Sequence, residues 1–464
     1  MKMEDMDLRF TEEDIVYISK YFNRELIAEG PIRKKQDNVF VNKIRKKAID
    51  KMNGGPKIKE SNLFYIGSAD FMVTENNGNR EFVILELNGG SSRGYLSLTH
   101  AQTKMLFNAY KEAIDNYKSE SKTKIVLIAT LPNDGLLQEK IMMIEYLRQC
   151  FEKDGQKVGI FNTSSFELSD NINIHIILSD YNLLLKHLTY KNNYIQFKGV
   201  NLDIIIGDGV ARRFSIIDDD VKSNWKNINT LIINFIYHIT DDKSSSYLAM
   251  RFGQDILKKY RIKHLQFAKA FNQAQMEEYL TRIITEFKKN YIIKPCGGSG
   301  GAGIQPITSK TTINDIQGIL NKSKAEFHEK FNKNRICYPY TIQEMADFSL
   351  IDYKNSKRTF DIRIYVVQKK GRIVPVGGVA RIARLPYHGD LKKEEFVVNI
   401  TGYKGPEVER GLGFSKKSLK KLNMTEKDLI DIFCASCEIF NICAANFMKI
   451  ISFNEWDKLL HSEN

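Results

Sequence analysis

Two apolar runs near the start of the chain are joined by a short polar segment. Residues 63–74 read LFYIGSADFMVT and residues 82–88 read FVILELN, while the intervening ENNGNRE contains an Asn-Gly pair. Short runs rich in Phe, Ile and Val on either side of such a turn predict the two strands of a β-hairpin. The first 60 residues are mostly polar, with a helix expected over 11–26 and a break at Gly54-Gly55-Pro56.

From residue 121 the pattern changes to short continuous apolar runs that alternate with helical segments. This alternation predicts an open parallel α/β layer, with strands at 124–130, 158–162, 172–178, 202–207 and 231–235. A helical stretch is expected over 243–288, followed by a strand at 291–295. Strands at 340–346, 360–368 and 372–384 predict a mixed sheet, and residues 415–447 predict a helix. The fold class is therefore α/β.

Composition narrows the classes of partner. The chain has 464 residues and a formal charge of +13, but its Lys and Arg residues are spread along it without a nucleic-acid-binding signature. We therefore expect no nucleic-acid partner; an anionic small molecule or an acidic protein suits the charge. No apolar run reaches the roughly 18 residues of a membrane span. The first ten residues lack a secretory pattern, so we expect a cytoplasmic protein.

Six cysteines are present, three of them close together at Cys434, Cys437 and Cys443 in an apolar stretch. A zinc or redox role would need further ligands, and no nearby His supplies one. Buried reduced thiols are the favoured interpretation.

The most informative segment is YIIKPCGGSGGAGI at 291–304. It places Lys294 at the end of an apolar strand, directly before a loop with five glycines. Glycines allow backbone N–H groups to converge on phosphate oxygens, and the lysine adds a positive charge. The spacing fits neither GxxxxGK[ST] nor GxGxxG opening a helix. A flexible surface loop is the alternative, but the pattern favours phosphate binding.

This segment resembles the glycine-rich lid of the ATP-grasp superfamily, and later segments resemble other motifs of that family in order. TIQEMADFS resembles its hinge strand, RTFDIRIYVV its Asp-x-Arg strand, and FVVNITGYKG its asparagine-bearing loop. The resemblance covers about 60–95 and 200–405. It implies ATP as cofactor and nucleotide contacts from Lys243, Lys294, Gly298, Ser299, Gly300, Gly301, Gln343, Glu344 and Asp361.

Arginines follow the Asp-x-Arg strand. Asp361 and Arg363 point to one face of a strand, as phosphate binding requires, although they could equally form a structural ion pair. Arg381 and Arg384 are three residues apart and should face opposite sides, so that only one reaches the site; Arg381 is favoured. The resemblance implies catalytic roles for Arg363, Arg381 and Asn399.

The family places its magnesium ligands after these motifs, as an Asp and a Glu-x-Asn pair, but no Glu-x-Asn follows Asn399 in this chain. The early hairpin carries the same pattern as Asp70, Glu86 and Asn88. Alternation puts Glu86 and Asn88 on one strand face, and pairing brings Asp70 alongside. We therefore predict a magnesium site on a circularly permuted ATP-grasp fold, with the helix at 415–447 beside the hairpin. An ordinary hairpin without a metal is the alternative.

The resulting organisation has four parts. Residues 1–60 form a helical segment, 61–120 the metal hairpin and a helix, 121–240 an α/β substrate domain, and 241–464 the nucleotide-binding region with its C-terminal helix. In the substrate domain, Asp208, Arg212 and Arg213 are candidate contacts, or a solvated charged loop.

The resemblance implies a ligase that activates a carboxylate with ATP as an acyl phosphate and joins it to an amine or thiol. It extends to pheganomycin-type peptide ligases and related antibiotic-pathway carboxylate–amine ligases. The positive charge would suit an acidic carrier protein as acceptor. Two alternatives stay open: a small-molecule kinase of the same fold, and a catalytically silent nucleotide-binding scaffold.

Overall fold

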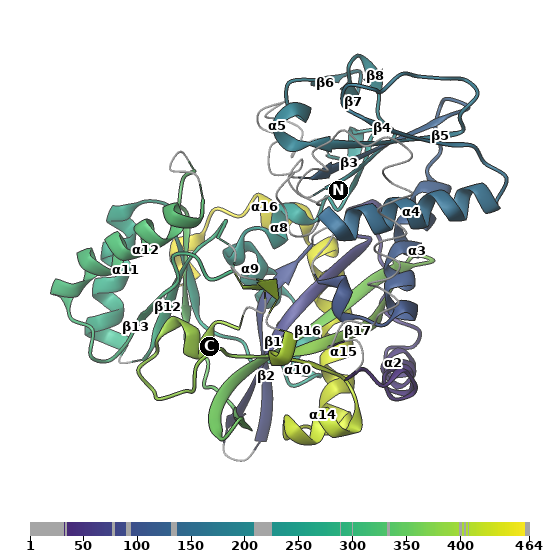
Figure 1. Ribbon diagram of the computed structural model, residues 1–464. Helices are drawn as coiled ribbons and strands as arrows, with labels where there is room; N and C mark the ends of the chain where they lie inside the picture. The colour runs from purple at the N-terminus through teal and green to yellow at the C-terminus, as the bar shows by residue number, and fades with distance from the viewer. Residues whose placement is uncertain are drawn as a thin grey trace.

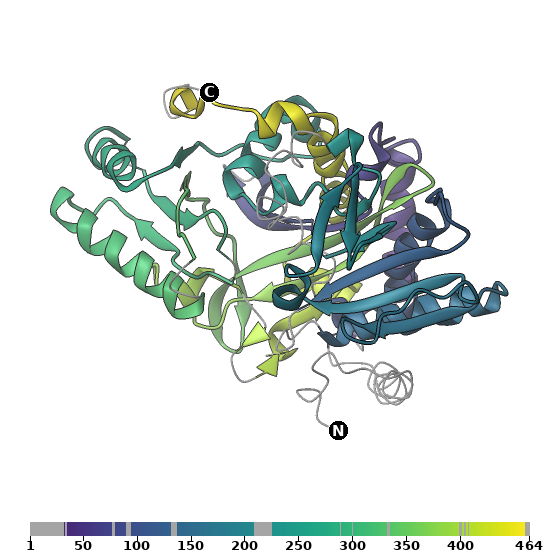
Figure 2. The same cartoon turned by 90° about the horizontal axis from the view of Figure 1, so that it is seen from above.

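The computed structural model describes residues 32, 35–76, 79–89, 94–130, 137–207, 225–287, 289–298, 300–331, 335–398, 401–402, 405–406 and 408–459. They form a mixed α/β protein with parallel and antiparallel sheets, shown in Figures 1 and 2. The helix expected at 11–26 lies outside the described residues.

The central sheet combines strands from opposite ends of the chain. The predicted hairpin is confirmed as β1 (Ile66–Asn76) and β2 (Asn79–Asn88), and β1 pairs antiparallel with β16 (Ser356–Lys369). The sheet order is β2-β1-β16-β17-β20, with β17 at Arg372–Ile382, β20 at Gly411–Gly413, and β15 (Leu350–Tyr353) also paired with β16.

One face of the central sheet is covered by helices and the other only in part. Residues 69, 71 and 73 of β1 pack into the core with α2 (Asn38–Lys51) and α15 (Glu426–Ala445). On the opposite face, Ile66 packs with α3 (His100–Asn116). Because side chains alternate along a strand, Asp70 and Met72 lie on this second face, beyond the end that α3 covers.

The helix expected at 415–447 divides into α14 (Lys416–Lys421), α15 and α16 (Phe447–Ile451). As expected, α15 lies beside the early hairpin. Phe440 stacks on Phe64 with ring centroids 4.6 Å apart, and a Cβ at Gly67 would lie 2.7 Å from the Phe440 ring. Glycine at 67 therefore permits close approach of helix and strand.

The predicted parallel layer is present as a five-stranded sheet in the order β10-β9-β3-β5-β4, with all neighbours parallel. It lies at the upper right of Figure 1. Its strands are β3 (Lys124–Thr130), β4 (Val158–Asn162), β5 (Ile174–Asp180), β9 (Ile204–Ile206) and β10 (Leu231–Ile233). A small antiparallel sheet of β6 (Leu188–Lys191), β7 (Tyr194–Phe197) and β8 (Val200–Asn201) follows β5.

A separate antiparallel sheet has the order β11-β14-β12-β13. Its strands are β11 (Phe267–Ala270), β12 (Tyr291–Pro295), β13 (Gln305–Ile307) and β14 (Tyr340–Glu344). Helices α11 (Gln273–Arg282) and α12 (Ile316–Lys330) pack on one face, at the left of Figure 1. The other face carries Lys294 and Gln343.

The prediction of continuous helix over 243–288 was wrong. Helices α9 (Lys243–Phe252), α10 (Gln254–Lys258) and α11 occupy most of this range, but β11 interrupts it. All four residues of β11 are buried, and so short a run has no period that distinguishes a strand from a helix.

The remaining elements of the described residues are α4 (Leu137–Lys153), α5 (Tyr181–Leu184), α8 (Tyr237–Thr240), α13 (Lys393–Phe396), β18 (Thr401–Gly402), β19 (Gly405–Pro406), the π-helix η6 (Ile283–Phe287), and the 3-10 turns η3 (Ser61–Leu63), η4 (Tyr95–Ser97), η5 (Trp225–Asn227), η7 (Ile313–Asp315), η8 (Val408–Arg410) and η9 (Trp456–Leu459).

Candidate active site

Four charged side chains form a buried cluster on the partly covered face of the central sheet. Asp70 on β1 lies directly opposite Arg363 on β16, and Asp361 lies opposite Arg381 on β17. Arg363 donates from Nε and Nη2 to the two carboxylate oxygens of Asp70, at 2.7 and 2.6 Å. Arg381 donates from Nη2 to Asp70 at 2.8 Å and from Nε to Asp361 at 2.7 Å. Arg381 therefore joins the two carboxylates.

Burial and these ion pairs together set the protonation of the cluster. Burial alone would raise the pKa of Asp70, but the charges and hydrogen bonds of Arg363 and Arg381 lower it to about 2. Burial raises the pKa of Asp361, as does the neighbouring charge of Asp70, although Arg381 opposes the rise. Asp70 is consequently ionised at neutral pH and holds both guanidinium groups in place.

Arg381 and Arg384, expected on one strand, differ in burial. Arg381 is buried within the cluster, whereas the side chain of Arg384 is exposed. Strand β17 ends at Ile382, so Arg384 lies beyond it and strand alternation does not apply to this pair. Only Arg381 joins the charged cluster.

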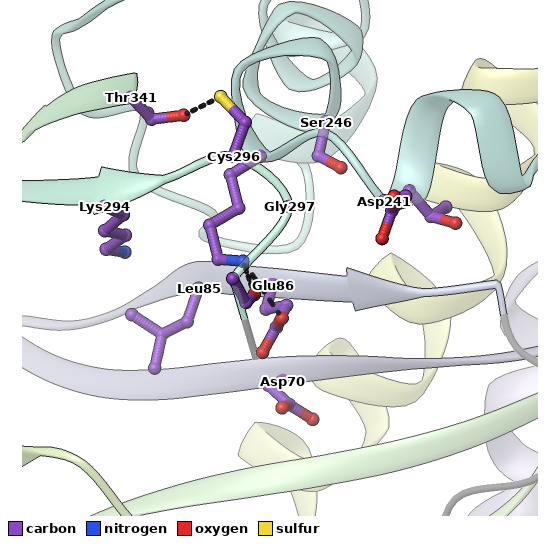
Figure 3. A network of polar contacts seen from close by, with 12 residues as sticks. Asp70, Leu85, Glu86, Asp241, Ser246, Lys294, Cys296, Gly297 and Thr341 are labelled. Atoms are coloured by element: carbon purple, nitrogen blue, oxygen red, sulfur yellow. Dashed lines mark hydrogen bonds and ion pairs between the residues drawn. The ribbon is translucent and has the colours of Figure 1, made fainter. Parts of the chain in front are cut away.

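Glu86 links the central sheet to the glycine loop. It lies opposite Asp70 on the neighbouring strand, and its carboxylate is 3.5 Å from Nζ of Lys243. The same ammonium donates to the carbonyl of Gly298 at 2.6 Å. Figure 3 shows Glu86 between the strand carrying Asp70 and the loop at Gly297. Lys243 is the first residue of α9 and follows Asp242, whose carboxylate caps that helix.

Lys294 lies on the face of the four-stranded sheet that turns away from α11 and α12. Its ammonium donates to Gln343 Oε1 at 2.6 Å and to the hydroxyl of Tyr247 at 3.1 Å. That hydroxyl also lies 2.7 Å from the carbonyl of Leu85, next to Glu86 on β2. Burial and the charge of Lys243 lower the pKa of Lys294 to about 7, against an opposing effect of Glu86. The two sheets therefore meet through Lys294 and Tyr247.

The glycine loop adopts backbone conformations that favour glycine. Gly300 and Gly301 have φ angles of 57° and 77°. A Cβ at Gly301 would approach Val397 Cγ1 to 2.8 Å and Lys393 Cε to 3.0 Å, so the loop packs closely against α13. Gly298 donates its N–H to the carbonyl of Pro295 at 3.0 Å.

The two residues expected at the hinge, Gln343 and Glu344, contact different partners. Gln343 is buried and contacts Lys294, whereas Glu344 pairs with Lys289 at 3.0 Å and accepts from the N–H of Gln266 at 3.3 Å. Successive residues of a strand face opposite sides, which explains the separation. The structure brings only Gln343 to the lysine.

The oxygen donors predicted to hold magnesium are close in register but differ in availability. Asn88 follows Glu86 by two residues on β2, and its buried Nδ2 has no hydrogen-bond partner among the described residues. Asp70 already accepts three hydrogen bonds from guanidinium groups, which uses most of its capacity. In the described part of the chain, no three His, Cys, Asp or Glu residues form a metal-binding group. Glu86 and Asn88 therefore fit a hard cation better than Asp70 does.

Several predicted residues lie outside the described ranges, namely Ser299, Asn399, Asp208, Arg212 and Arg213. Sequence reasoning did not single out Tyr247, although it is four residues after Lys243 and therefore on the same helix face. The cysteines agree with the expected free thiols: Cys434, Cys437 and Cys443 are all buried and unbridged. Their thiol pKa values are raised by burial.

Comparisons with known proteins give a limited result. No protein-family model matches the chain, and no curated protein matches it. A glutathione synthetase-like effector from Globodera pallida, solved in its apo form, is similar over 80% of this chain and 85% of its own, at 11% identity and a TM-score of 0.39. D-alanyl-alanine synthetase A from Vibrio cholerae is similar over 71% and 82%, at 10% identity and a TM-score of 0.35. Both TM-scores are low, so function has to be argued from the residues of this chain.

Within the described residues, no helix combines the length and apolar character that crossing a membrane requires.

Proposed function

We propose that this chain is an ATP-dependent ligase of the ATP-grasp type, which activates a carboxylate as an acyl phosphate and joins it to an amine or thiol. One observation carries the proposal: Lys243 spans the space between the glycine loop and Glu86, which lies beside the Asp70–Arg363–Arg381 cluster. The groups proposed to bind phosphate, on α9 and on the loop after β12, thus face the carboxylates and guanidinium groups of the central sheet.

In the proposed reaction the protein mainly positions and neutralises charge. Lys243, Lys294 and the N–H groups of the glycine loop would bind the phosphates of ATP. A carboxylate oxygen of the substrate attacks the γ-phosphorus, and the bond to the β–γ bridging oxygen breaks to release ADP. The amine or thiol then attacks the acyl carbon and phosphate leaves. Arg363 and Arg381 would stabilise the transferred phosphoryl group.

Magnesium would be held by Glu86 and Asn88, with Asp70 contributing through the acceptor capacity that its arginines leave. A bound divalent cation supplies charge neutralisation at the phosphates. The unpartnered atom of Asn88 is the amide nitrogen Nδ2, which cannot ligate a cation but could donate to a phosphate oxygen while Oδ1 faces the metal. Gln343 orients Lys294 in this scheme.

The proposal includes a circular permutation of the ATP-grasp domain. The pairing of β1 with β16 supports it, since strand segments 293 residues apart contribute Asp70 and Arg363 to one cluster. Residues 61–120 and 241–464 would then form one functional unit, with residues 121–240 as the substrate domain.

The test measures ADP release by the full chain with ATP, Mg²⁺ and a panel of acid–amine and acid–thiol pairs. Glu86→Gln should lower turnover on the order of 100-fold or more, because it removes the anionic side chain proposed to hold magnesium at the phosphates. Glu81→Gln, on the same strand but away from the cluster, is the matched control. Turnover that survives Glu86→Gln would exclude this metal assignment.

Product analysis then distinguishes the reaction outcomes. A ligase should give a joined product and free phosphate only when acid and nucleophile are both present. A stable phosphorylated product formed without the nucleophile would instead identify a kinase. If the wild-type chain binds ATP but releases no ADP with any pair, the ligase proposal fails in favour of a scaffold.

A further inference from the structure

A cavity of about 300 Å³ lies where α9, β11 and the C-terminal segment meet. Strand β11 contacts η9, and α16 contacts both α8 and α9; α8 and α16 lie side by side near the centre of Figure 1. The volume is at the lower end of the range of roughly 300–1,000 Å³ typical of ligand sites, so a small molecule would suit it.

An ion pair is central to the polar lining of this cavity, which also includes His238 and Asn454. Lys269 on β11 is only 8% exposed, and its ammonium lies 2.5 Å from Oδ2 of Asp242. The other oxygen of Asp242 accepts the N–H groups of Ser244 and Ser245 at 2.9 and 3.2 Å. An ammonium has three N–H donors, and this pair uses one. The Lys269 ammonium can therefore donate to a second anionic partner while it remains paired with Asp242.

Ser245 adds an unused polar group. Its side chain is 7% exposed and lines the cavity, and no hydrogen bond of its hydroxyl occurs among the described residues. The hydroxyl is therefore available to a ligand. A ligand oxygen or N–H in the cavity would satisfy it.

The remaining wall is aromatic. The ring of Trp456 lies 4.5 Å and that of Phe271 5.3 Å from the Lys269 ammonium. Phe453 packs edge-on against Trp456 with centroids 5.0 Å apart. Phe271 is 46% exposed. An apolar group of a ligand would cover these rings.

We propose that this cavity binds a free α-amino acid with a large apolar side chain. Its charged lining residues, Lys269 and Asp242, are one cation and one anion, and a zwitterion can pair with both while the site stays electrically neutral. The ligand carboxylate would bind Lys269 and the Ser245 hydroxyl. Its ammonium would bind Oδ2 of Asp242, which among the described residues accepts only from Lys269, whereas Oδ1 already accepts two backbone N–H groups. The side chain would lie against Phe453 and Trp456. The proposal does not rest on the ligase activity.

Titration calorimetry of the full chain, without ATP or Mg²⁺, tests the proposal. The probes are L-phenylalanine, L-tryptophan, L-leucine and L-methionine, compared with N-acetyl-L-phenylalanine, which lacks the ammonium, and L-phenylalaninamide, which lacks the carboxylate. At least one free amino acid should bind, and the two derivatives should bind tenfold more weakly or worse than L-phenylalanine. No binding by any of the four, or equal binding by a derivative, would overturn the proposal.

Variants then locate the site. Lys269→Met removes the charge but keeps most of the stem and should weaken binding at least tenfold, and Ser245→Ala should weaken it less. Lys258→Met, an exposed lysine on α10, is the matched control and should bind as the wild type does. Circular dichroism checks that each variant is folded. Undiminished binding by Lys269→Met would place the amino acid elsewhere and refute the assignment.

Discussion

Asp70 and Arg363 are separated by 293 positions in the sequence, yet they form a two-point ion pair across neighbouring strands. The pair lies at the seam between the early hairpin and the β16–β17 hairpin. Arg381, one strand further on, donates to the same carboxylate. A single buried aspartate thus connects three strands. The same cluster is expected to stabilise the central sheet and to form part of the proposed phosphate site.

The first prediction concerns stability. Asp70→Asn should lower the free energy of unfolding by about 3–5 kcal/mol, because it leaves Arg363 buried without its anionic partner. The matched control is Asp352→Asn, which removes an ion pair to Lys357 whose side chains are 80% and 58% exposed. An exposed pair contributes roughly 0–1 kcal/mol. Urea denaturation measures both changes, and equal losses would contradict the structural importance of the buried pair.

Much of the fold could be predicted because the patterns are local. The strands at 124–130 and 158–162 have the predicted bounds, and the Asn77-Gly78 pair in the sequence signalled the hairpin. By contrast, β11 and the small sheet at 188–201 were not anticipated. Their strands span two to four residues, too few for a period to appear, and their pairing depends on distant partners.

For the candidate site, too, local motifs could be predicted from the sequence, whereas contacts between distant side chains could not. Motif order was enough to propose Asp70, Glu86, Lys294 and Arg381 as neighbours. The sequence could not show that the arginines occupy most of the acceptor capacity of Asp70, since this depends on side-chain directions across three strands. Nor could it show that Glu344 pairs with Lys289 instead of joining Gln343.

The second prediction compares the two arginines after β16. Arg381→Met should reduce ADP release on the order of 100-fold or more, because its guanidinium is placed to stabilise phosphoryl transfer. Arg384→Met should stay within about twofold, as expected for an exposed side chain outside the cluster. Arg381→Lys tests geometry, since a lysine cannot bridge Asp70 and Asp361 with the same planar group. Wild-type turnover in Arg381→Met would remove this residue from the proposed machinery.

The third prediction separates backbone strain from loop packing. Gly301→Ala and Gly199→Ala both place alanine at a positive φ, 77° and 79° respectively, at a shared cost of about 1 kcal/mol. Only at Gly301 does the new Cβ meet neighbours, namely Val397 and Lys393; at Gly199 it meets nothing within 4 Å. We expect Gly301→Ala to weaken ATP binding and Gly199→Ala to leave it unchanged, as measured by calorimetry. Equal ATP affinity in the two variants would show that the packing of loop against α13 is unimportant for the nucleotide.

The fourth prediction follows from the buried ammonium of Lys294. Its pKa is lowered from 10.5 to about 7 by burial and by the charge of Lys243. A bound polyphosphate favours the charged form and raises the pKa again. ATP binding at pH 7.5 should therefore take up protons, and ATP affinity should fall as pH rises above about 7. In the free protein, the same shift means that the unfolded chain holds a proton that the folded chain has lost between pH 7 and 10.5. This group alone thus makes the free energy of unfolding increase with pH across that window.

Calorimetry in two buffers of different ionisation enthalpy measures the proton uptake directly. Lys294→Met should abolish the uptake as well as weaken binding. Lys289→Met, which changes a half-exposed lysine of the same sheet region, should retain both. Weaker ATP binding in Lys294→Met with the proton uptake unchanged would mean that another group titrates, and that the lysine contributes contact without the linked proton.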